Sequence, residues 1–170
     1  MIPSSQNTLL FNPSWTQINA NFHVPNMFPR RGHTTILAKN SLFIFGGYPG
    51  EEIADQLKQE DKDSYYKSII KLNLGSKEAS IHQISQANGN PFMQSFAGIH
   101  YHSAVFLGNL MYIFGGYNGY TENYRQPEMW SINIENFSFK KHETKGTPPR
   151  KRNKPLMTMV GKNYILLYGG

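Results

Sequence analysis

An internal repeat constrains this chain more than any other feature of its sequence. The pentapeptide Ile-Phe-Gly-Gly-Tyr occurs at residues 44–48 and again at residues 113–117, and a weaker copy, Leu-Tyr-Gly-Gly, stands at residues 167–170. Self-similarity at a spacing of tens of residues is typical of folds that stack one supersecondary unit on copies of itself. The sequence therefore predicts a repeat protein.

The residues before each glycine pair predict a β-hairpin. An apolar run leads into the glycines at residues 42–45, 110–114 and 164–168, as expected of a strand that is covered on both faces. Each run follows an asparagine, a residue that tolerates the positive φ of a tight hairpin turn. These asparagines are Asn40, Asn109 and Asn163. Thirteen residues before the first glycine, the alignment places His33, His102 and Leu156 at the start of the first strand.

Two further strands complete the repeating unit. Third strands are predicted at residues 68–74 and 128–134, and residues 9–12 fit the same frame. Fourth strands are predicted at residues 15–18, 81–84 and 139–142, where Trp15, Ile81 and Phe139 take corresponding places. A unit of four antiparallel strands cannot bury both faces alone, so it is expected to stack on its neighbours. The fold class is therefore all-β.

Composition excludes several kinds of function. The chain has no cysteine, which rules out disulfides, thiolate metal sites and cysteine nucleophiles. The first residues do not read as a signal peptide, and no apolar run approaches the roughly 18 residues that span a bilayer. We therefore expect a protein without membrane contact, located in the cytoplasm, with the nucleus as the alternative.

The chain resembles the kelch repeat family. The resemblance rests on the Pro-Arg-Arg-Gly-His sequence at residues 29–33, on the glycine pairs after an apolar strand, on Tyr48 and Tyr117, and on Trp15 in a fourth strand. It implies kelch-type β-propeller blades, which are four-stranded antiparallel sheets around a central channel. Most members of the family are binding scaffolds. A few relatives are enzymes, including a copper-dependent galactose oxidase and a sialic acid mutarotase.

The repeats divide the chain into about three blade-equivalents. Residues 28–84 and 96–142 each form a blade, residues 1–18 supply the third and fourth strands of a split blade, and residues 147–170 supply the first two strands of another. Propellers typically have four to eight blades, so the ring is expected to be incomplete. The favoured explanation is that the chain is part of a longer protein. The alternative is a homodimer in which two chains complete a six-bladed ring.

The sequence gives no support for catalysis or for a bound cofactor. His100 and His102 alternate along a strand and point to the same side, as in the beginning of a metal site. His102 occupies the ordinary histidine position of the repeat, however, and no acidic residue lies near it in sequence. The copper chemistry of the enzyme relative also needs a cysteine. The glycine pairs belong to no phosphate-binding pattern. We therefore predict no catalytic residue, no metal and no cofactor.

The candidate partner-binding residues are those that do not repeat. They lie in the acidic insertion at residues 51–63 and in the segment at residues 118–125, where Tyr and Arg are typical of binding hot spots. They are Glu51, Glu52, Tyr120, Tyr124 and Arg125. The residues assigned to the architecture of the repeat are Trp15, His33, Gly46, Gly47, Tyr48, His102, Gly115, Gly116, Tyr117, Gly169 and Gly170.

The predicted function is a non-catalytic protein-interaction scaffold that binds through loops on a propeller face. The alternative is a fragment of a carbohydrate-active propeller enzyme. The basic stretch at residues 140–154 makes nucleic acid a third candidate partner. This partner is disfavoured, because the stretch covers a fourth strand and a proline-containing connection.

Overall fold

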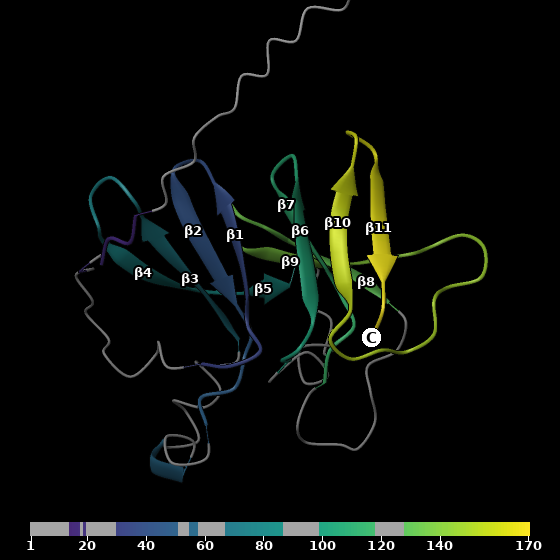
Figure 1. Ribbon diagram of the computed structural model, residues 1–170, viewed down its shortest axis with the longest axis horizontal. Coiled ribbons are helices and arrows are strands. Elements are labelled where there is room, and N and C mark those ends of the chain that lie inside the picture. The colour runs from purple at the N-terminus through teal and green to yellow at the C-terminus, as the bar shows by residue number, and fades with distance from the viewer. Residues whose placement is uncertain are drawn as a thin grey trace, which may run out of the picture.

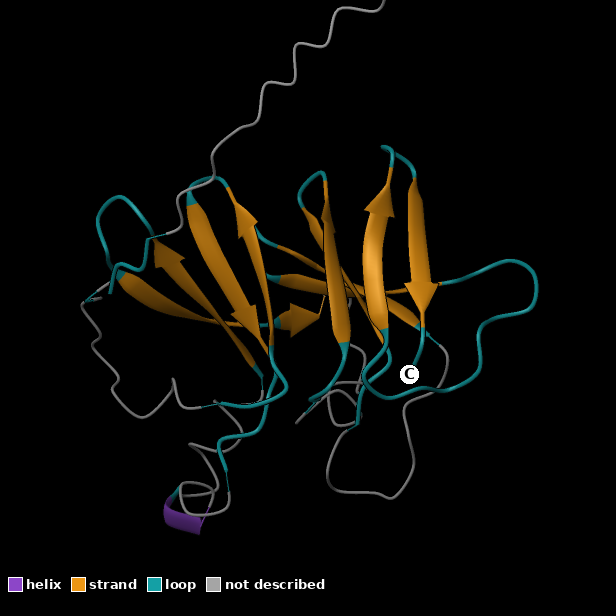
Figure 2. Ribbon diagram, viewed as in Figure 1, coloured by secondary structure: helices purple, strands orange, loops and turns teal. Residues whose placement is uncertain are grey.

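The computed structural model describes residues 14–17, 19, 30–50, 55–57, 67–86, 99–117 and 128–170. Within them, β-strands dominate, and a short helical turn occurs at residues 55–56 in the insertion (Figure 2). In this described part of the chain, no helix is long and apolar enough to cross a membrane.

The first sheet is a complete four-stranded blade. Its strands are β1 (Thr34–Ala38), β2 (Ser41–Phe45), β3 (Ser68–Asn73) and β4 (Ala79–Gln83), paired antiparallel in chain order. The turn between β1 and β2 is made by Lys39 and Asn40 with φ of 47° and 56°. Two successive positive φ values match the right-handed twist of a two-residue hairpin.

The second sheet has the same plan with one addition. Its strands β6 (Ser103–Leu107), β7 (Leu110–Phe114), β8 (Met129–Asn133) and β9 (Ser138–His142) again pair antiparallel in chain order. The short strand β5 (Ser85–Gln86), which follows the first blade, pairs parallel with β9. The chain that leaves the first blade therefore becomes an edge strand of the second.

The third sheet has two strands, β10 (Leu156–Val160) and β11 (Tyr164–Tyr168). Figure 1 shows β1, β6 and β10 side by side, and β6 contacts both of the other two. The three sheets form an open arc, with β1, β6 and β10 as the corresponding strands of successive blades.

The predicted role of asparagine in the turns is correct at Asn40 only. In the turn between β6 and β7, Gly108 takes the positive φ, at 64°. In the turn between β10 and β11, Gly161 takes it, at 61°. Glycine adopts this conformation without the steric cost that a Cβ atom brings.

The register corrects two of the predicted alignments. Leu156 pairs with Tyr168 as Thr34 pairs with Phe45, so Pro155, and not Leu156, takes the place of His33 and His102. The alignment was wrong by one residue because the last hairpin turn, at residues 161–163, is one residue longer than the other two.

The second alignment was wrong in the fourth strands. Phe139 pairs with Ile132, and Ala79 pairs with Leu72, the corresponding residue of the first blade. Ala79 therefore takes the place of Phe139, while Ile81 lies two residues further along its strand. An alignment on apolar residues alone cannot distinguish two positions of a strand that share a face.

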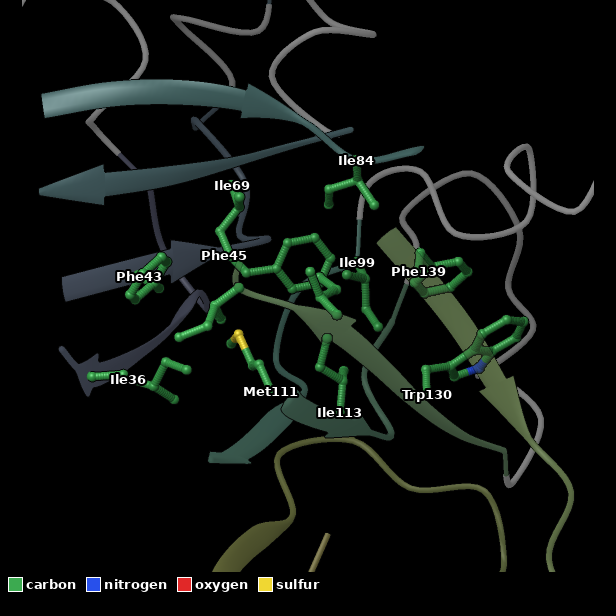
Figure 3. Packing of buried hydrophobic residues seen from close by; sticks show 13 residues of the cluster. Ile36, Phe43, Phe45, Ile69, Ile84, Ile99, Met111, Ile113, Trp130 and Phe139 are labelled. Carbon is green, nitrogen blue, oxygen red and sulfur yellow. The ribbon is translucent and has the colours of Figure 1, made fainter. Parts of the chain in front are cut away.

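The largest core lies between the first and second blades. It contains Phe45 and Ile69 from one side and Met111, Ile113 and Phe139 from the other, all at 1% exposure or less (Figure 3). A smaller cluster, with Val105, Phe114 and Met157, joins the second blade to β10 and β11. The stacking that the repeats predicted is therefore present at both junctions.

The predicted fourth strand at residues 15–18 is not formed in its described part. Residues 15–17 belong to no strand, and Trp15 is completely exposed, with a relative exposure of 102%. A fourth strand needs a third strand beside it, and the described residues supply none at that place.

Candidate interaction surface

The two ends of the blades differ. The end that we call the hairpin face carries the turns at residues 39–40, 108–109 and 161–163, at the top of Figure 1. The opposite end, the loop face, carries the glycine pairs, and the long connections after Gly50 and Tyr117 leave from it. On the hairpin face, Lys39 forms an ion pair with Glu135 of the next blade. Two long, non-repeating connections start from the loop face, which makes that face the candidate interaction surface.

Each of the first two glycine pairs is in close contact with the backbone of the next blade. We call the space beside a glycine pair its socket. The Gly47 N–H donates to the carbonyl of Ile99 at 2.8 Å, and the Gly116 N–H donates to the carbonyl of Arg152 at 3.1 Å. A Cβ atom on Gly46, which has φ of 66°, would lie 2.5 Å from the Ile99 carbonyl oxygen. Glycine is required because backbone from the neighbouring blade occupies the space of a side chain.

The histidine of the repeat has two different environments. His102 is buried, its Nε2 lies 2.7 Å from the Thr34 hydroxyl of the first blade, and its ring meets the Phe45 ring edge-on at 5.4 Å. His33 is exposed, and its Nδ1 lies 3.2 Å from the Arg30 carbonyl oxygen. His102 therefore ties its blade to the preceding one, which is a structural role.

His100 lies among three tyrosine rings. Its ring centroid lies 5.9 Å from that of Tyr48, 5.1 Å from that of Tyr101 and 5.1 Å from that of Tyr117. Isolated β-bridges join His100 to Tyr117 and Arg31 to Tyr48. Among the described residues, no group of three or more metal-ligating side chains comes together. The two bridges instead fix Tyr48 and Tyr117 at the points where the long connections begin.

A backbone ladder runs across the three blades at the loop face. The Tyr101 N–H donates to the Gly32 carbonyl at 2.7 Å, and the Lys154 N–H donates to the Tyr101 carbonyl at 2.8 Å. All three residues have positive φ, at 68°, 56° and 55° in chain order. Tyr101 and Lys154 hold this costly conformation because the ladder and the blade contacts around it determine the backbone.

Cations lie beside the aromatic rings of this ladder. The Lys154 ammonium lies 4.6 Å from the Tyr101 ring centroid, and the Arg31 guanidinium lies 5.3 Å from that of Tyr48. Both basic residues are exposed, whereas the tyrosines are partly buried. A surface of this kind offers positive charge and flat apolar area together, as binding hot spots do.

The structure bears only indirectly on the predicted contact residues. Glu51, Glu52, Tyr120, Tyr124 and Arg125 lie outside the described residues. The residues that come directly before these two segments, Gly50 and Tyr117, both lie on the loop face. The five residues therefore remain predictions.

Sequence reasoning missed three residues of this surface. Arg31, Tyr101 and Lys154 come one or two positions before the histidine place of their repeats, the last of which is held by Pro155. The alignment error at Leu156 hid Lys154, because it shifted that repeat by one residue. A search for Tyr, Arg and Lys directly before each first strand finds all three.

Two partly buried histidines lie at equivalent places in the fourth strands. His82 stacks on Phe137 of the second blade, with ring centroids 4.0 Å apart, and His142 contacts Tyr112 at 5.2 Å. Burial lowers the pKa of His82 below its usual value of 6.5, and the charge of Lys71 adds to that effect. Burial also lowers the pKa of His142, helped by Lys140. Both shifts favour the neutral ring, which suits His82 in its contact with the next blade and His142 in its contacts within the second blade.

Four-stranded antiparallel sheets that stack through one end strand and leave their loops on one face are blades of a β-propeller. The described strands form an open part of such a ring. The family model of the KLHDC2/KLHL20/DRC7 Kelch-repeats domain matches residues 7–170. The chain therefore belongs to the Kelch-repeat family.

Known proteins agree with this assignment. The chain is 28% identical to human host cell factor 2 over 84% of its own length and 17% of that protein. It is 38% identical to human Kelch domain-containing protein 3 over 41% of its own length and 18% of that protein. It is 29% identical to the Rho GTPase-activating protein gacHH of Dictyostelium discoideum, over 82% of its length and 8% of that protein. The matched segments thus cover less than a fifth of each of these relatives.

The solved structure of YjhT shares the fold. It superposes with a TM-score of 0.56 at 14% sequence identity, over 84% of this chain and 34% of that one. At this identity the likeness shows the fold alone. The chain corresponds to about a third of that protein, in keeping with the open arc of blades.

Proposed function

We propose that the chain is a non-catalytic interaction scaffold that binds a protein partner through the loop face, and that it does so in the cytoplasm. One observation carries the proposal. Tyr48 and Tyr117 are each held by a β-bridge at the base of a non-repeating connection, and an exposed cation lies beside the aromatic rings of the same face. Rigid blades thus present variable loops around a fixed patch, which is how scaffolds position binding residues.

The fixed patch consists of Arg31, Tyr48, Tyr101 and Lys154. Tyr and Arg supply contact area with little loss of side-chain freedom, so they contribute strongly to binding. The two cations favour a partner segment with an acidic group, while the partly exposed tyrosine rings favour an aromatic or aliphatic side chain next to it. The predicted contact residues Glu51, Glu52, Tyr120, Tyr124 and Arg125 would extend this patch from the neighbouring loops.

The test uses peptides selected on the chain from a random display library. The strongest peptide is labelled, and its dissociation constant is measured by fluorescence polarisation for the chain and for Arg31→Ala, Lys154→Ala, Tyr120→Ala and Arg125→Ala. We expect each loop-face variant to weaken binding about tenfold or more, which corresponds to about 1.4 kcal/mol. Lys162→Ala, on the hairpin face, is the matched control and should leave the dissociation constant unchanged.

Equal binding by all four loop-face variants would contradict the proposal, as would a loss with Lys162→Ala. The enzyme alternative makes a different prediction. A carbohydrate-active fragment would release product from a panel of glycosides, and its residual activity would depend on acidic residues rather than on Arg31 or Lys154.

A further inference from the structure

The connection between β9 and β10, at residues 143–155, lies on the loop face. β9 ends at His142, which pairs with Met129, and β10 begins at Leu156, which pairs with Tyr168. Tyr168 directly precedes the last glycine pair, and Met129 pairs with the residue that precedes the second one. Both ends of the connection are therefore at the level of the glycine pairs. Figure 1 shows the connection extending away from the sheets beside β11 and returning to the start of β10.

This connection is the most exposed part of the described chain. Residues 143–151 are all exposed, and none of them belongs to a helix or a strand. No other run of exposed residues of this length occurs among the described residues. On one side, Thr147, Pro148 and Pro149 border an apolar cavity together with Met157. An irregular, exposed connection is accessible to the active site of a modifying enzyme.

The exposed stretch contains a threonine that is followed by two prolines and an arginine, from Thr147 to Arg150. Proline disfavours the helical conformation of the residue before it, so Pro148 keeps Thr147 extended, and Pro149 does the same for Pro148. The two prolines thus limit the separations that the Thr147 hydroxyl and the Arg150 cation can adopt. The sequence has no other place where a serine or threonine precedes a proline.

This pattern is the one that proline-directed serine/threonine kinases take as substrate. Such a kinase accommodates a proline directly after the acceptor hydroxyl and a basic residue at the third position after it. Proline fits there because its φ is fixed and it has no N–H group that needs an acceptor. Kinases use such patterns of shape and charge to distinguish their substrates. Thr144, which is also exposed, is followed by Lys145 and lacks the pattern.

The threonine of this pattern lies within the basic stretch of the chain. Residues 140–154 contain seven lysines or arginines and one acid, which gives this part of the loop face an excess of positive charge. Exposed cations lie on both sides of the threonine, at Lys145, Arg150 and Lys151. The stretch ends at Lys154, a member of the fixed patch on the loop face. Positive charge around that patch favours an acidic partner.

We propose that Thr147 is phosphorylated by a proline-directed serine/threonine kinase, and that the phosphate weakens the binding of an acidic partner to the loop face. Phosphorylation itself requires only the exposed connection, whereas its effect on binding rests on the proposed scaffold function of the same face. Thr147 Oγ1 attacks the γ-phosphorus of ATP, so that a new O–P bond forms and the bond from that phosphorus to the β-phosphate oxygen breaks. ADP leaves with the electron pair of the broken bond, and the hydroxyl proton passes to the catalytic base of the kinase and then to water.

The effect on binding follows from charge. A phosphate on threonine carries a charge of about −1.5 to −2 near neutral pH. It therefore lowers the net charge of the chain from +6 to about +4. Its oxygens also accept charge-assisted hydrogen bonds from cations nearby in sequence, such as Arg150 and Lys151. Cations that pair with the phosphate no longer attract an acidic partner.

The first experiment locates the phosphate. The folded chain is incubated with a purified proline-directed kinase and ATP, and its peptides are analysed by tandem mass spectrometry. We expect one phosphate per chain, on Thr147. Thr147→Val and Pro148→Ala should each lower incorporation about tenfold or more, because one removes the hydroxyl and the other removes the proline that the kinase recognises. Thr144→Val is the matched control and should be phosphorylated like the unchanged chain.

Two results would overturn the site. One is no incorporation into the unchanged chain, and the other is equal incorporation into Thr147→Val. Equal incorporation into Pro148→Ala would overturn the assignment to a proline-directed kinase. The substituted residues lie outside the strands, so circular dichroism should be the same for every variant.

The second experiment measures binding. The strongest peptide from the display selection is labelled, and its association and dissociation rates are measured with the unmodified and the phosphorylated chain at about 0.05 M and about 0.5 M salt. We expect phosphorylation to lower the association rate about threefold or more at low salt and much less at high salt, because charges at the edge of an interface act mainly on association. Thr147→Val, carried through the same kinase reaction, should keep the rates of the unmodified chain.

Equal association rates of the two forms at low salt would overturn the effect on binding, as would tighter binding after phosphorylation. A selected peptide without acidic residues would overturn it too. Location of the phosphate does not involve the peptide, so the two proposals fail separately. Absence of phosphate on Thr147 leaves the scaffold test unaffected. Absence of any peptide that binds the loop face overturns the scaffold function together with its regulation, and leaves the phosphorylation site standing.

The melting temperature shows whether the phosphate acts locally. Thr147 is exposed and lies outside the strands, so its phosphate stays in water rather than entering the apolar cavity. The phosphorylated and unmodified chains should therefore melt at the same temperature. A large drop after phosphorylation would mean that the phosphate unfolds the blades, and it would overturn an action through charge.

Discussion

The junction between the first two blades is closed, whereas the junction between the second blade and the β10–β11 hairpin is open. Both have the same inner walls, because the inner hairpins and the first residues of the third strand correspond position by position. They differ in the outer two strands of the following blade, which the described part of the chain supplies at the closed junction and not at the open one. Inner hairpins therefore bring blades together, while the side chains of the outer strands fill the space between them.

Additional contacts cross the closed junction near its rim. Lys39 pairs with Glu135, His82 stacks on Phe137, and β5 pairs with β9. Exposed ion pairs contribute little to stability, so the apolar core with its outer-strand side chains must carry most of the free energy of this junction.

The largest expected effect is at an outer-strand residue of the closed junction. Phe139 is 1% exposed and stacks on Trp130, with ring centroids 4.6 Å apart. Phe139→Ala should lower the free energy of unfolding by about 3–5 kcal/mol, since it leaves a cavity in the core. Leu167→Ala at the open junction should cost about 1–2 kcal/mol, because Leu167 is only partly buried.

Urea unfolding of dilute, monomeric samples measures both values. Equal losses for the two variants would break the comparison, since they would show that the open junction is as well packed as the closed one.

Alanine substitutions at Gly46 and Gly169 form a matched pair, one at a glycine in contact with the next blade and one at a glycine without such a contact. Gly46 and Gly169 have nearly the same φ, 66° and 69°, so alanine is strained to a similar degree at both places. Gly169→Ala should cost about 1–2 kcal/mol from that strain alone. Gly46→Ala should cost about 3 kcal/mol or more, because its Cβ would also lie 2.5 Å from the Ile99 carbonyl oxygen.

Thermal unfolding of the dilute variants, followed by circular dichroism, separates the two contributions. The difference between the variants reports the close approach of the next blade. A Gly169→Ala loss as large as that of Gly46→Ala would mean that the last socket is already filled.

The smallest expected effect is a pH dependence of stability. The pKa values of His82 and His142 are lowered in the folded chain, so the unfolded chain binds protons more readily near pH 6. Their contribution is fully present above about pH 6.5 and is lost as the pH falls from there through the folded pKa values.

Melting temperatures between pH 7.5 and pH 5 measure this dependence. His82→Gln and His142→Gln should each make the melting temperature less dependent on pH, because each removes a group whose pKa is lowered in the folded chain. His82 lies at the closed junction, and His142 lies at the equivalent place of the second blade. Stability that rises as the pH falls in this range would contradict the direction of both shifts.

Much of the fold was predictable from local patterns. The glycine pairs, the apolar runs before them and the asparagines of the third strands predicted the three inner hairpins and the strands β3 and β8, because these residues satisfy local demands of turns and strands. The first strand of the last hairpin was misaligned by one residue, and the third strand predicted at residues 9–12 lies outside the described residues. Pro155 and Ala79 were missed, since turn lengths and strand register depend on pairing between distant residues. Arg31, Tyr101 and Lys154 stand at comparable local positions in their repeats, but that they form one surface depends on the stacking of the sheets.

The repeat, the all-β class and the family could be read from the sequence alone, because they depend on periodicity and on glycine positions that a single chain displays. Which residues share a junction, which glycine pair has no neighbour and that Trp15 is exposed became visible in the folded chain. These properties arise from stacking between blades, and stacking joins residues that lie tens of positions apart. A local pattern specifies a blade, and the neighbouring blade then determines whether the side chains on its faces are buried.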